Sequence, residues 1–182
     1  LSFTKSINSL LSNLSGATYN IFISFFAASS KILFISILCI SFIGCTNSNT
    51  KGNELKEGLT AMDVVKNVEE KAPMQMPMEL DEEMAKDLAY LNLEDVEDFG
   101  IIKAMIINSA DMAVVVKAKD GKIDSVKASL QKMLDTEREN AYLPDQKEKL
   151  EKAIFKEKGN YVILLVNKDV KAAEAAVDEC FE

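Results

Sequence analysis

The run Tyr161-Val162-Ile163-Leu164-Leu165-Val166 is the most apolar segment on the C-terminal side of Cys45. β-Branched and aromatic residues favour extended backbone, and a run without polar alternation fits the interior of a sheet. Val114-Val115-Val116 has the same character, which is typical of a strand that is covered on both faces or centrally placed. These two runs predict the centre of a β-sheet.

Each run belongs to a predicted hairpin that is followed by a helical pattern. The first hairpin joins residues 101–108 to 112–117, and the second joins residues 153–156 to 161–167. Apolar residues then recur at helical spacing after Gly121 and after Asp169. The sequence therefore predicts an α+β fold with a four-stranded antiparallel sheet built from two β-β-α units. We expect the helices to pack mainly on one face of that sheet.

Two short helices are predicted to precede the sheet. Thr60 begins the first, because Asp63 follows three residues later as an acidic variant of a capping box, and Pro73 ends it. The second covers Glu79 to Leu91, with acidic residues in its first turn that suit the positive end of the helix dipole.

Met74-Gln-Met-Pro-Met78 lies between these two helices and carries a methionine at every second position. Soft thioethers could bind copper(I). The alternative interpretation is an extended connection whose methionines cover the core as adaptable apolar side chains. The sequence has no histidine, so we predict neither a metal site nor a cofactor.

The N-terminal part predicts export and lipidation. Lys31 is followed by an uncharged apolar run from Ile32 to Ile43, which as a helix would be about 18 Å long and hence too short for a bilayer core of about 30 Å. This run fits the hydrophobic region of a signal peptide. Phe42-Ile43-Gly44-Cys45 resembles a lipobox, in which cleavage between Gly44 and Cys45 makes the lipidated cysteine the new N-terminus. The alternative is an uncleaved anchor over residues 21–43.

These features predict three parts of the chain. Residues 1–44 form the signal peptide, and we interpret residues 1–30 as an over-extended start. Residues 45–58 form a lipidated cysteine with a polar, turn-rich tether, and residues 59–182 form a single α+β domain. The acylated Cys45 would hold the protein in the lipid bilayer at the outer face of the cytoplasmic membrane.

Charge and composition limit the classes of function. The formal net charge is −8, which argues against nucleic acid as a partner. Without histidine, a nucleophile and its base would have to come from lysine or carboxylates, so we do not expect an enzyme. Cys180 would have no cysteine partner after processing and is predicted to be a small buried apolar residue.

The segment from Met84 to Val166 resembles a family of small uncharacterised lipoproteins of Gram-positive bacteria, catalogued as a domain of unknown function of the DUF4358 type. The most specific matching pieces are Ala141-Tyr-Leu-Pro-Asp145 and Lys158-Gly-Asn-Tyr-Val162. The resemblance implies a shared fold and a membrane-tethered location, and it implies no activity.

These two pieces are open to an architectural and a functional interpretation. In the architectural one, Gly159 supplies the positive φ of a tight hairpin and Tyr142 buries its ring while its hydroxyl reaches a backbone group. In the functional one, Tyr142, Asp145, Asn160 and Tyr161 line a common groove.

A binding or interaction module of unknown ligand is the function that the sequence favours, with a membrane or cell-wall protein as a candidate partner. A structural component of the cell envelope and an enzyme without histidine are the alternatives. An exposed apolar patch on the sheet's uncovered face would favour the binding module, and a uniformly charged face would weaken it.

Overall fold

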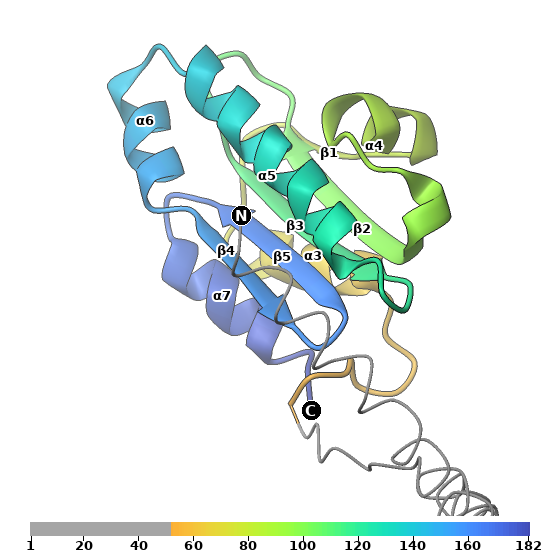
Figure 1. Cartoon of the computed structure of the whole chain (residues 1–182). Helices are drawn as coiled ribbons and strands as arrows, with labels where there is room; N and C mark the ends of the chain where they lie inside the picture. The colour runs from red at the N-terminus through yellow and green to blue at the C-terminus, as the bar shows by residue number, and fades with distance from the viewer. Residues whose placement is uncertain (1–51) are drawn as a thin grey trace, which may run out of the picture. The chain divides into compact units, whose positions relative to one another are not determined.

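The computed structural model describes residues 52–182, and Figure 1 shows the elements that they form. In chain order these are α3 (Ala61–Lys71), β1 (Pro77–Glu79), α4 (Glu82–Leu88), the short 3-10 helix η1 (Leu93–Asp95), β2 (Val96–Ala104), β3 (Met112–Ala118), α5 (Ile123–Asn140), α6 (Pro144–Glu151), β4 (Ile154–Lys158), β5 (Tyr161–Val166) and α7 (Val170–Asp178). The predicted signal peptide and the residues Gly44 and Cys45 lie outside the described residues.

The predicted α+β class and the antiparallel sheet are confirmed, but the sheet has five strands rather than four. Its order is β1-β2-β3-β5-β4, and every neighbouring pair is antiparallel. The two hairpins β2–β3 and β4–β5 join through β3 and β5, the strands that hold the two apolar runs. The additional strand is β1, which pairs Pro77 to Glu79 with the end of β2. Three residues are too few to display a periodic pattern, which is why the sequence did not reveal this strand.

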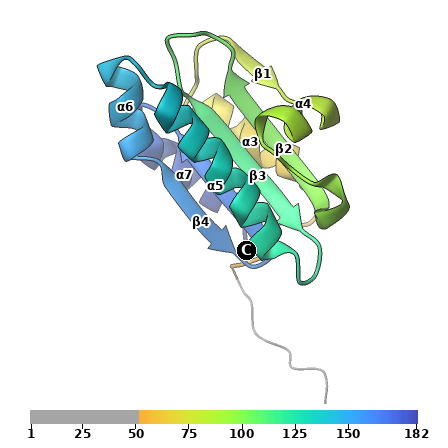
Figure 2. The same cartoon turned by 45° about the horizontal axis from the view of Figure 1, so that its top comes forward.

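The expectation that the helices pack mainly on one face is wrong. Helices α3 and α7 cover one face of the sheet, and α4, α5 and α6 lie on the other, as Figure 2 shows. Successive side chains of β5 accordingly alternate between two separate cores: Val162, Leu164 and Val166 in one, Tyr161, Ile163 and Leu165 in the other. A central strand that is apolar at every position requires cover on both faces, and this sheet provides it.

The two short helices before the main part of the sheet are present. Thr60 and Asp63 form the predicted reciprocal cap of α3: the Thr60 hydroxyl accepts from the Asp63 N–H at 3.2 Å, and the Thr60 N–H donates to Asp63 Oδ2 at 2.8 Å. Helix α4 is shorter than expected, because Asp81 caps it by accepting from the Met84 N–H and Glu79 belongs to β1.

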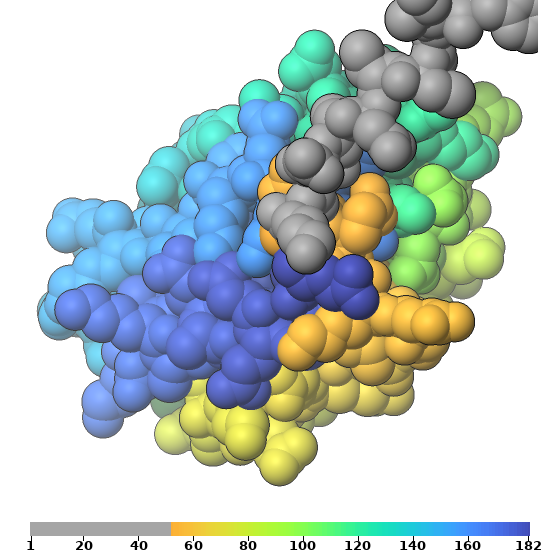
Figure 3. All heavy atoms as spheres, turned by 90° about the horizontal axis from the view of Figure 1, so that it is seen from below, coloured from red at the N-terminus to blue at the C-terminus, as the bar shows by residue number. Residues whose placement is uncertain are grey.

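The first described residues are hydrogen bonded to the C-terminal residues. Leu55 forms an antiparallel bridge with Phe181, the Lys56 N–H donates to the Cys180 carbonyl at 2.9 Å, and the Glu182 N–H donates to the Glu54 carbonyl at 3.1 Å. Figure 3 shows these two ends of the described chain side by side. The backbone is thus attached to the domain from Glu54 onward, within the range predicted as tether. Cys180 is buried, as predicted.

None of the helices within residues 52–182 is long and apolar enough to cross a membrane.

Candidate functional site

The structure does not bring the four residues of the predicted groove together. Tyr142 and Asp145 lie where α5 passes into α6, whereas Asn160 and Tyr161 lie at the β4–β5 turn. The Asn160 carbonyl accepts from the N–H of Ala118, the last residue of β3, at 2.8 Å. Gln146, next to Asp145, contacts the loop that precedes β3 (Gln146 Nε2 to the Ile107 carbonyl, 3.0 Å). The two pairs therefore lie at opposite ends of β3, about 20 Å apart.

The β4–β5 turn is an architectural corner. Gly159 has a φ of +58°, and a Cβ at this position would lie 2.6 Å from the carbonyl oxygen of Asn53. Asn160 Nδ2 donates to Asp120 Oδ1 at 3.2 Å, and Tyr161 packs its ring edge-on against Phe181 with ring centres 5.2 Å apart. These contacts connect the hairpin to the first described residues, to the start of α5 and to the C-terminus.

Tyr142 does not bury its ring, contrary to the architectural interpretation. The residue is 57% exposed and lines an open cleft of about 500 Å³ between the β2–β3 loop, the C-terminal end of α5 and the start of α6. Clefts that hold small molecules usually have volumes of roughly 300–1,000 Å³. The cleft has a volume in this range, and we take it as the candidate site in the part of the chain that the structure describes.

Exposed apolar side chains surround the mouth of this cleft. We call Met76, Met105, Ile107 and Tyr142 the apolar rim. Met105, Ile107 and Tyr142 line the cleft, and Ile107 is 82% exposed. Met76 is also exposed, and its carbonyl accepts from the Met105 N–H at 3.0 Å. The rim accounts for most of the large apolar side chains that are exposed among residues 52–182, and such a cluster is typical of a surface that meets a ligand or a partner.

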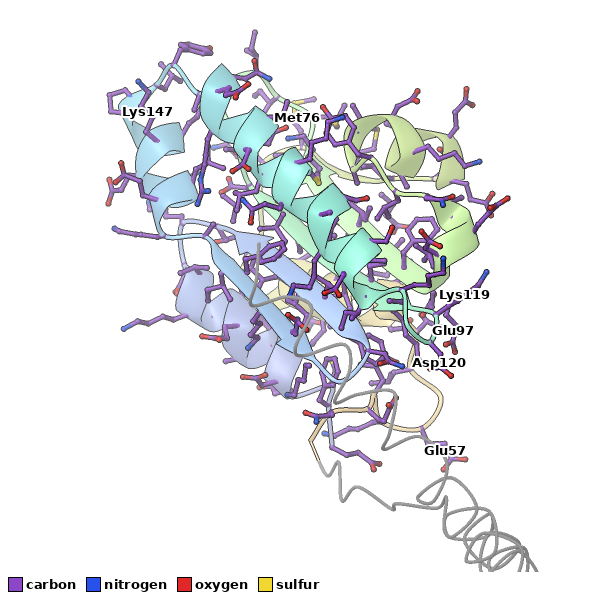
Figure 4. The ribbon with its side chains drawn as sticks, viewed as in Figure 1. Glu57, Met76, Glu97, Lys119, Asp120 and Lys147 are labelled. Carbon is purple, nitrogen blue, oxygen red and sulfur yellow. The ribbon has the colours of Figure 1, made fainter. Side chains whose placement is uncertain are left out.

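Met76 belongs to this rim in a strained backbone conformation. Its φ is +48°, in the left-handed region that side chains other than glycine disfavour. Figure 4 shows Met76 at the end of the molecule opposite Glu57 and Asp120. Of the three methionines that could have formed a copper site, Met74 is buried, Met76 exposed and Met78 half-buried. No cluster of three or more acidic or cysteine side chains suited to a metal ion occurs among the described residues.

An ion pair forms part of the cleft lining. Lys103 of β2 and Glu137 of α5 meet at 3.0 Å, with side chains only 13% and 24% exposed. Helix α5 ends nearby at Asn140, and its final carbonyl groups give this wall a partial negative charge. The cleft thus combines apolar walls with one positive and one negative group.

Gln146 connects two walls of the cleft, the start of α6 and the β2–β3 loop. The sequence analysis did not identify this residue. Its Oε1 accepts from the N–H groups of Leu143 (3.1 Å) and Tyr142 (3.3 Å), and its Nε2 donates to the Ile107 carbonyl. One buried amide therefore holds the start of α6 against the β2–β3 loop. A glutamine at the third position after the Leu143 N-cap is a known capping signal, which could have identified this residue.

Lys149, also on α6, forms a mostly buried ion pair with Asp111, where β3 begins. Nζ lies 3.1 Å from Asp111 Oδ2 and 3.0 Å from Asp145 Oδ2, and the Ser109 hydroxyl donates to the same Asp111 oxygen at 2.6 Å. Burial disfavours the charge of Lys149, but hydrogen bonds to Asp145 and Asp111 outweigh it and raise the lysine pKa. Asp145, a predicted groove residue, is thus an exposed partner of Lys149 within the same helix.

Glu69 on α3 provides a pH-dependent prediction. Burial raises the pKa of its carboxyl; the Met74 N–H, which donates to both oxygens at 3.2 Å, opposes the rise, and the charge of Asp111 adds to it. A raised acid pKa means that the folded state holds the proton more tightly than the unfolded state, so stability falls as pH rises through the titration range. We expect Glu69→Gln, which keeps a hydrogen-bond acceptor, to raise the melting temperature at pH 7 by a few degrees.

The advantage of Glu69→Gln should shrink below about pH 4, where glutamate is protonated in both states. The neighbouring Glu70→Gln serves as the matched control, because Glu70 is exposed and should show no such gain. Thermal unfolding at pH 7 and pH 4 measures both. A variant that is less stable than the wild type at pH 7 would contradict the expectation.

The fold defines a small α+β domain with an open cleft at one end of its sheet. A family model described as "Domain of unknown function (DUF4358)" matches residues 62–167, which is more than half of the chain. The chain belongs to this family. Comparisons with curated proteins and with solved structures yield no match.

Proposed function

We propose that the protein is a lipid-anchored binding module at the outer face of the cytoplasmic membrane, and that it engages its partner through the cleft and the apolar rim. The observation that carries the proposal is the concentration of exposed apolar side chains, Ile107 above all, around a cleft of about 500 Å³. A cluster of exposed apolar side chains lowers the solubility of a protein. A binding role explains why this cluster is present on the surface.

The position of the cleft supports this function. The described chain begins beside the C-terminus, where Glu54 and Leu55 pair with residues 181 and 182, at the end of the sheet opposite the cleft. Anchoring through Cys45 then leaves the cleft end free. The residues between Cys45 and Gly52 would span about 15 Å as a flexible tether, enough to keep the domain beside the lipid headgroups.

The polar groups near the cleft favour binding over catalysis. Ser109 lines the cleft, but its hydroxyl donates to Asp111, and that carboxylate is already paired with Lys149. The raised pKa of Lys149 keeps this amine protonated, so it is a poor general base. A structural envelope component remains the second candidate, since a rigid domain beside the membrane suits it too.

Photo-cross-linking in whole cells tests the proposal. We expect Ile107→p-benzoylphenylalanine to give one reproducible adduct in the membrane fraction, since this side chain is the most exposed of the rim. The matched control carries the same amino acid at Lys119, an exposed position near the opposite end of the sheet, and should not give that adduct.

Mass spectrometry of the membrane-extracted protein tests the lipid anchor separately from the cleft. We expect an N-terminal peptide that begins at Cys45 and carries diacylglycerol on the cysteine sulfur. An unmodified Cys45, or a product that keeps residues 32–43, would refute the lipid anchor, whereas equal adducts from positions 107 and 119 would refute the cleft as the binding surface.

A further inference from the structure

We propose that the cleft binds a small apolar zwitterion, namely an apolar amino acid or dipeptide, whose ammonium group pairs with Glu137 and whose carboxylate pairs with Lys103. This inference rests on the proposed binding function of the same cleft and specifies its ligand.

Lys103 and Glu137 have hydrogen-bonding capacity that their mutual contact does not use. The contact joins Lys103 Nζ to Glu137 Oε2, and within residues 52–182 each side chain has only the other as an ion-pair partner. An ammonium group has three donors and a carboxylate has two accepting oxygens. Both side chains are largely shielded from water and line the cleft, so a ligand that enters the cleft can pair with the donors and acceptors that their mutual contact leaves unused.

The arrangement of charge matches a zwitterion better than an ion of one sign. A simple anion would gain from Lys103 but would meet Glu137 and the C-terminal carbonyls of α5; a simple cation would meet Lys103. An amino acid carries both charges on groups attached to the same α-carbon and can place each beside its opposite. The end of α5 determines the orientation of the ligand. Asn140 and Ala141 line this wall, and the last carbonyl groups of the helix favour the ammonium group beside them.

The walls suit an apolar side chain on the same ligand. Ala104, Met105 and Ala110 line the cleft together with the rim residues Ile107 and Tyr142. Methionine side chains adapt to differently shaped apolar groups. A volume of about 500 Å³ accommodates an amino acid or a dipeptide.

Isothermal titration of the full chain in detergent tests the inference with L-leucine and L-leucyl-L-leucine as probes. Leucinamide lacks the carboxylate and 4-methylpentanoate lacks the ammonium group, so each serves as a matched control. We expect at least one zwitterionic probe to bind saturably, and the single-charge control compounds to bind at least tenfold more weakly than L-leucine or not at all. This comparison uses only the wild-type protein and does not depend on whether a variant folds.

The variants Lys103→Met and Glu137→Gln should each weaken binding at least tenfold, and Glu137→Gln should also reduce the preference for L-leucine over 4-methylpentanoate. Lys152→Met is the control, because its ion pair with Glu148 is exposed and lies outside the cleft lining; it should bind normally. No saturable binding of either zwitterion, or equal binding of the single-charge compounds, overturns the inference. An intact adduct at position 107 in that case would leave the proposed binding function standing.

Discussion

Replacing Gly100 by alanine is expected to lower the free energy of unfolding by about 3 kcal/mol, the upper range for overpacking a core. Gly100 lies in β2 directly beneath the start of α3, where an added Cβ would be 2.4 Å from the Ala61 carbonyl oxygen and 2.6 Å from Met62 Cα. Both are backbone atoms, so no change of side-chain rotamer relieves the overlap. The helix would have to move away from the sheet, although its first N–H is fixed by the Asp98 carboxylate at 2.7 Å.

Gly121→Ala is the matched control for this substitution. Gly121 has a φ of +72°, but nothing lies within 4 Å of the position of an added Cβ. Its cost is therefore that of the left-handed conformation alone, about 1–2 kcal/mol. Urea unfolding of the two variants measures the difference. Equal destabilisation would show that α3 is not held against β2 as closely as the distances indicate.

The apolar runs identified the central strands correctly. Their lack of polar positions also indicates that both faces of the sheet are covered, and the architecture that we predicted did not include this. Val114-Val115-Val116 and residues 161–166 are apolar at every position, which requires helices on both faces of the sheet. We expected two equivalent β-β-α units to place their helices on the same face. The structure instead sends α5 and α7 to opposite faces, because each face of β3 and β5 needs its own cover.

The predicted groove failed because it ignored the direction of the elements. The chain leaves the β2–β3 loop along β3 and returns along α5. The corner at Tyr142 therefore lies at the N-terminal end of β3. β4 runs in the same direction as β3, because both are antiparallel to β5, and it ends at the turn that holds Asn160. Asn160 therefore lies at the C-terminal end of β3. Counting these reversals would have separated the two corners. The cleft itself required the three-dimensional structure, since Lys103 and Glu137 lie far apart in sequence and look like ordinary surface charges.

Lys149→Met is expected to destabilise the protein by about 3 kcal/mol, the lower end of the range for breaking a buried ion pair. The side chains of Lys149 and Asp111 are only 12% and 8% exposed, so the substitution leaves a buried carboxylate with the Ser109 hydroxyl as its remaining side-chain partner among residues 52–182. In helix α6, with the sequence Pro-Asp-Gln-Lys-Glu-Lys-Leu-Glu, this lysine looks solvent-exposed. Lys152→Met, which removes an exposed lysine of an i,i+4 pair directly after α6, should cost less than about 0.5 kcal/mol.

The double variant Lys149→Met with Asp111→Asn removes both charges and keeps an acceptor for Ser109, so it should recover more than half of the loss. The pH dependence gives an independent check. Because the pKa of Lys149 is raised above its usual value of about 10.4, its contribution is complete at neutral pH and is lost as pH rises through the raised pKa. The stability gap between wild type and Lys149→Met should therefore narrow only in strongly alkaline solution. A gap that is already closed at pH 9 would contradict the raised pKa, and a gap that persists unchanged in strongly alkaline solution would mean that the lysine stabilises α6 through the packing of its aliphatic stem rather than through its charge.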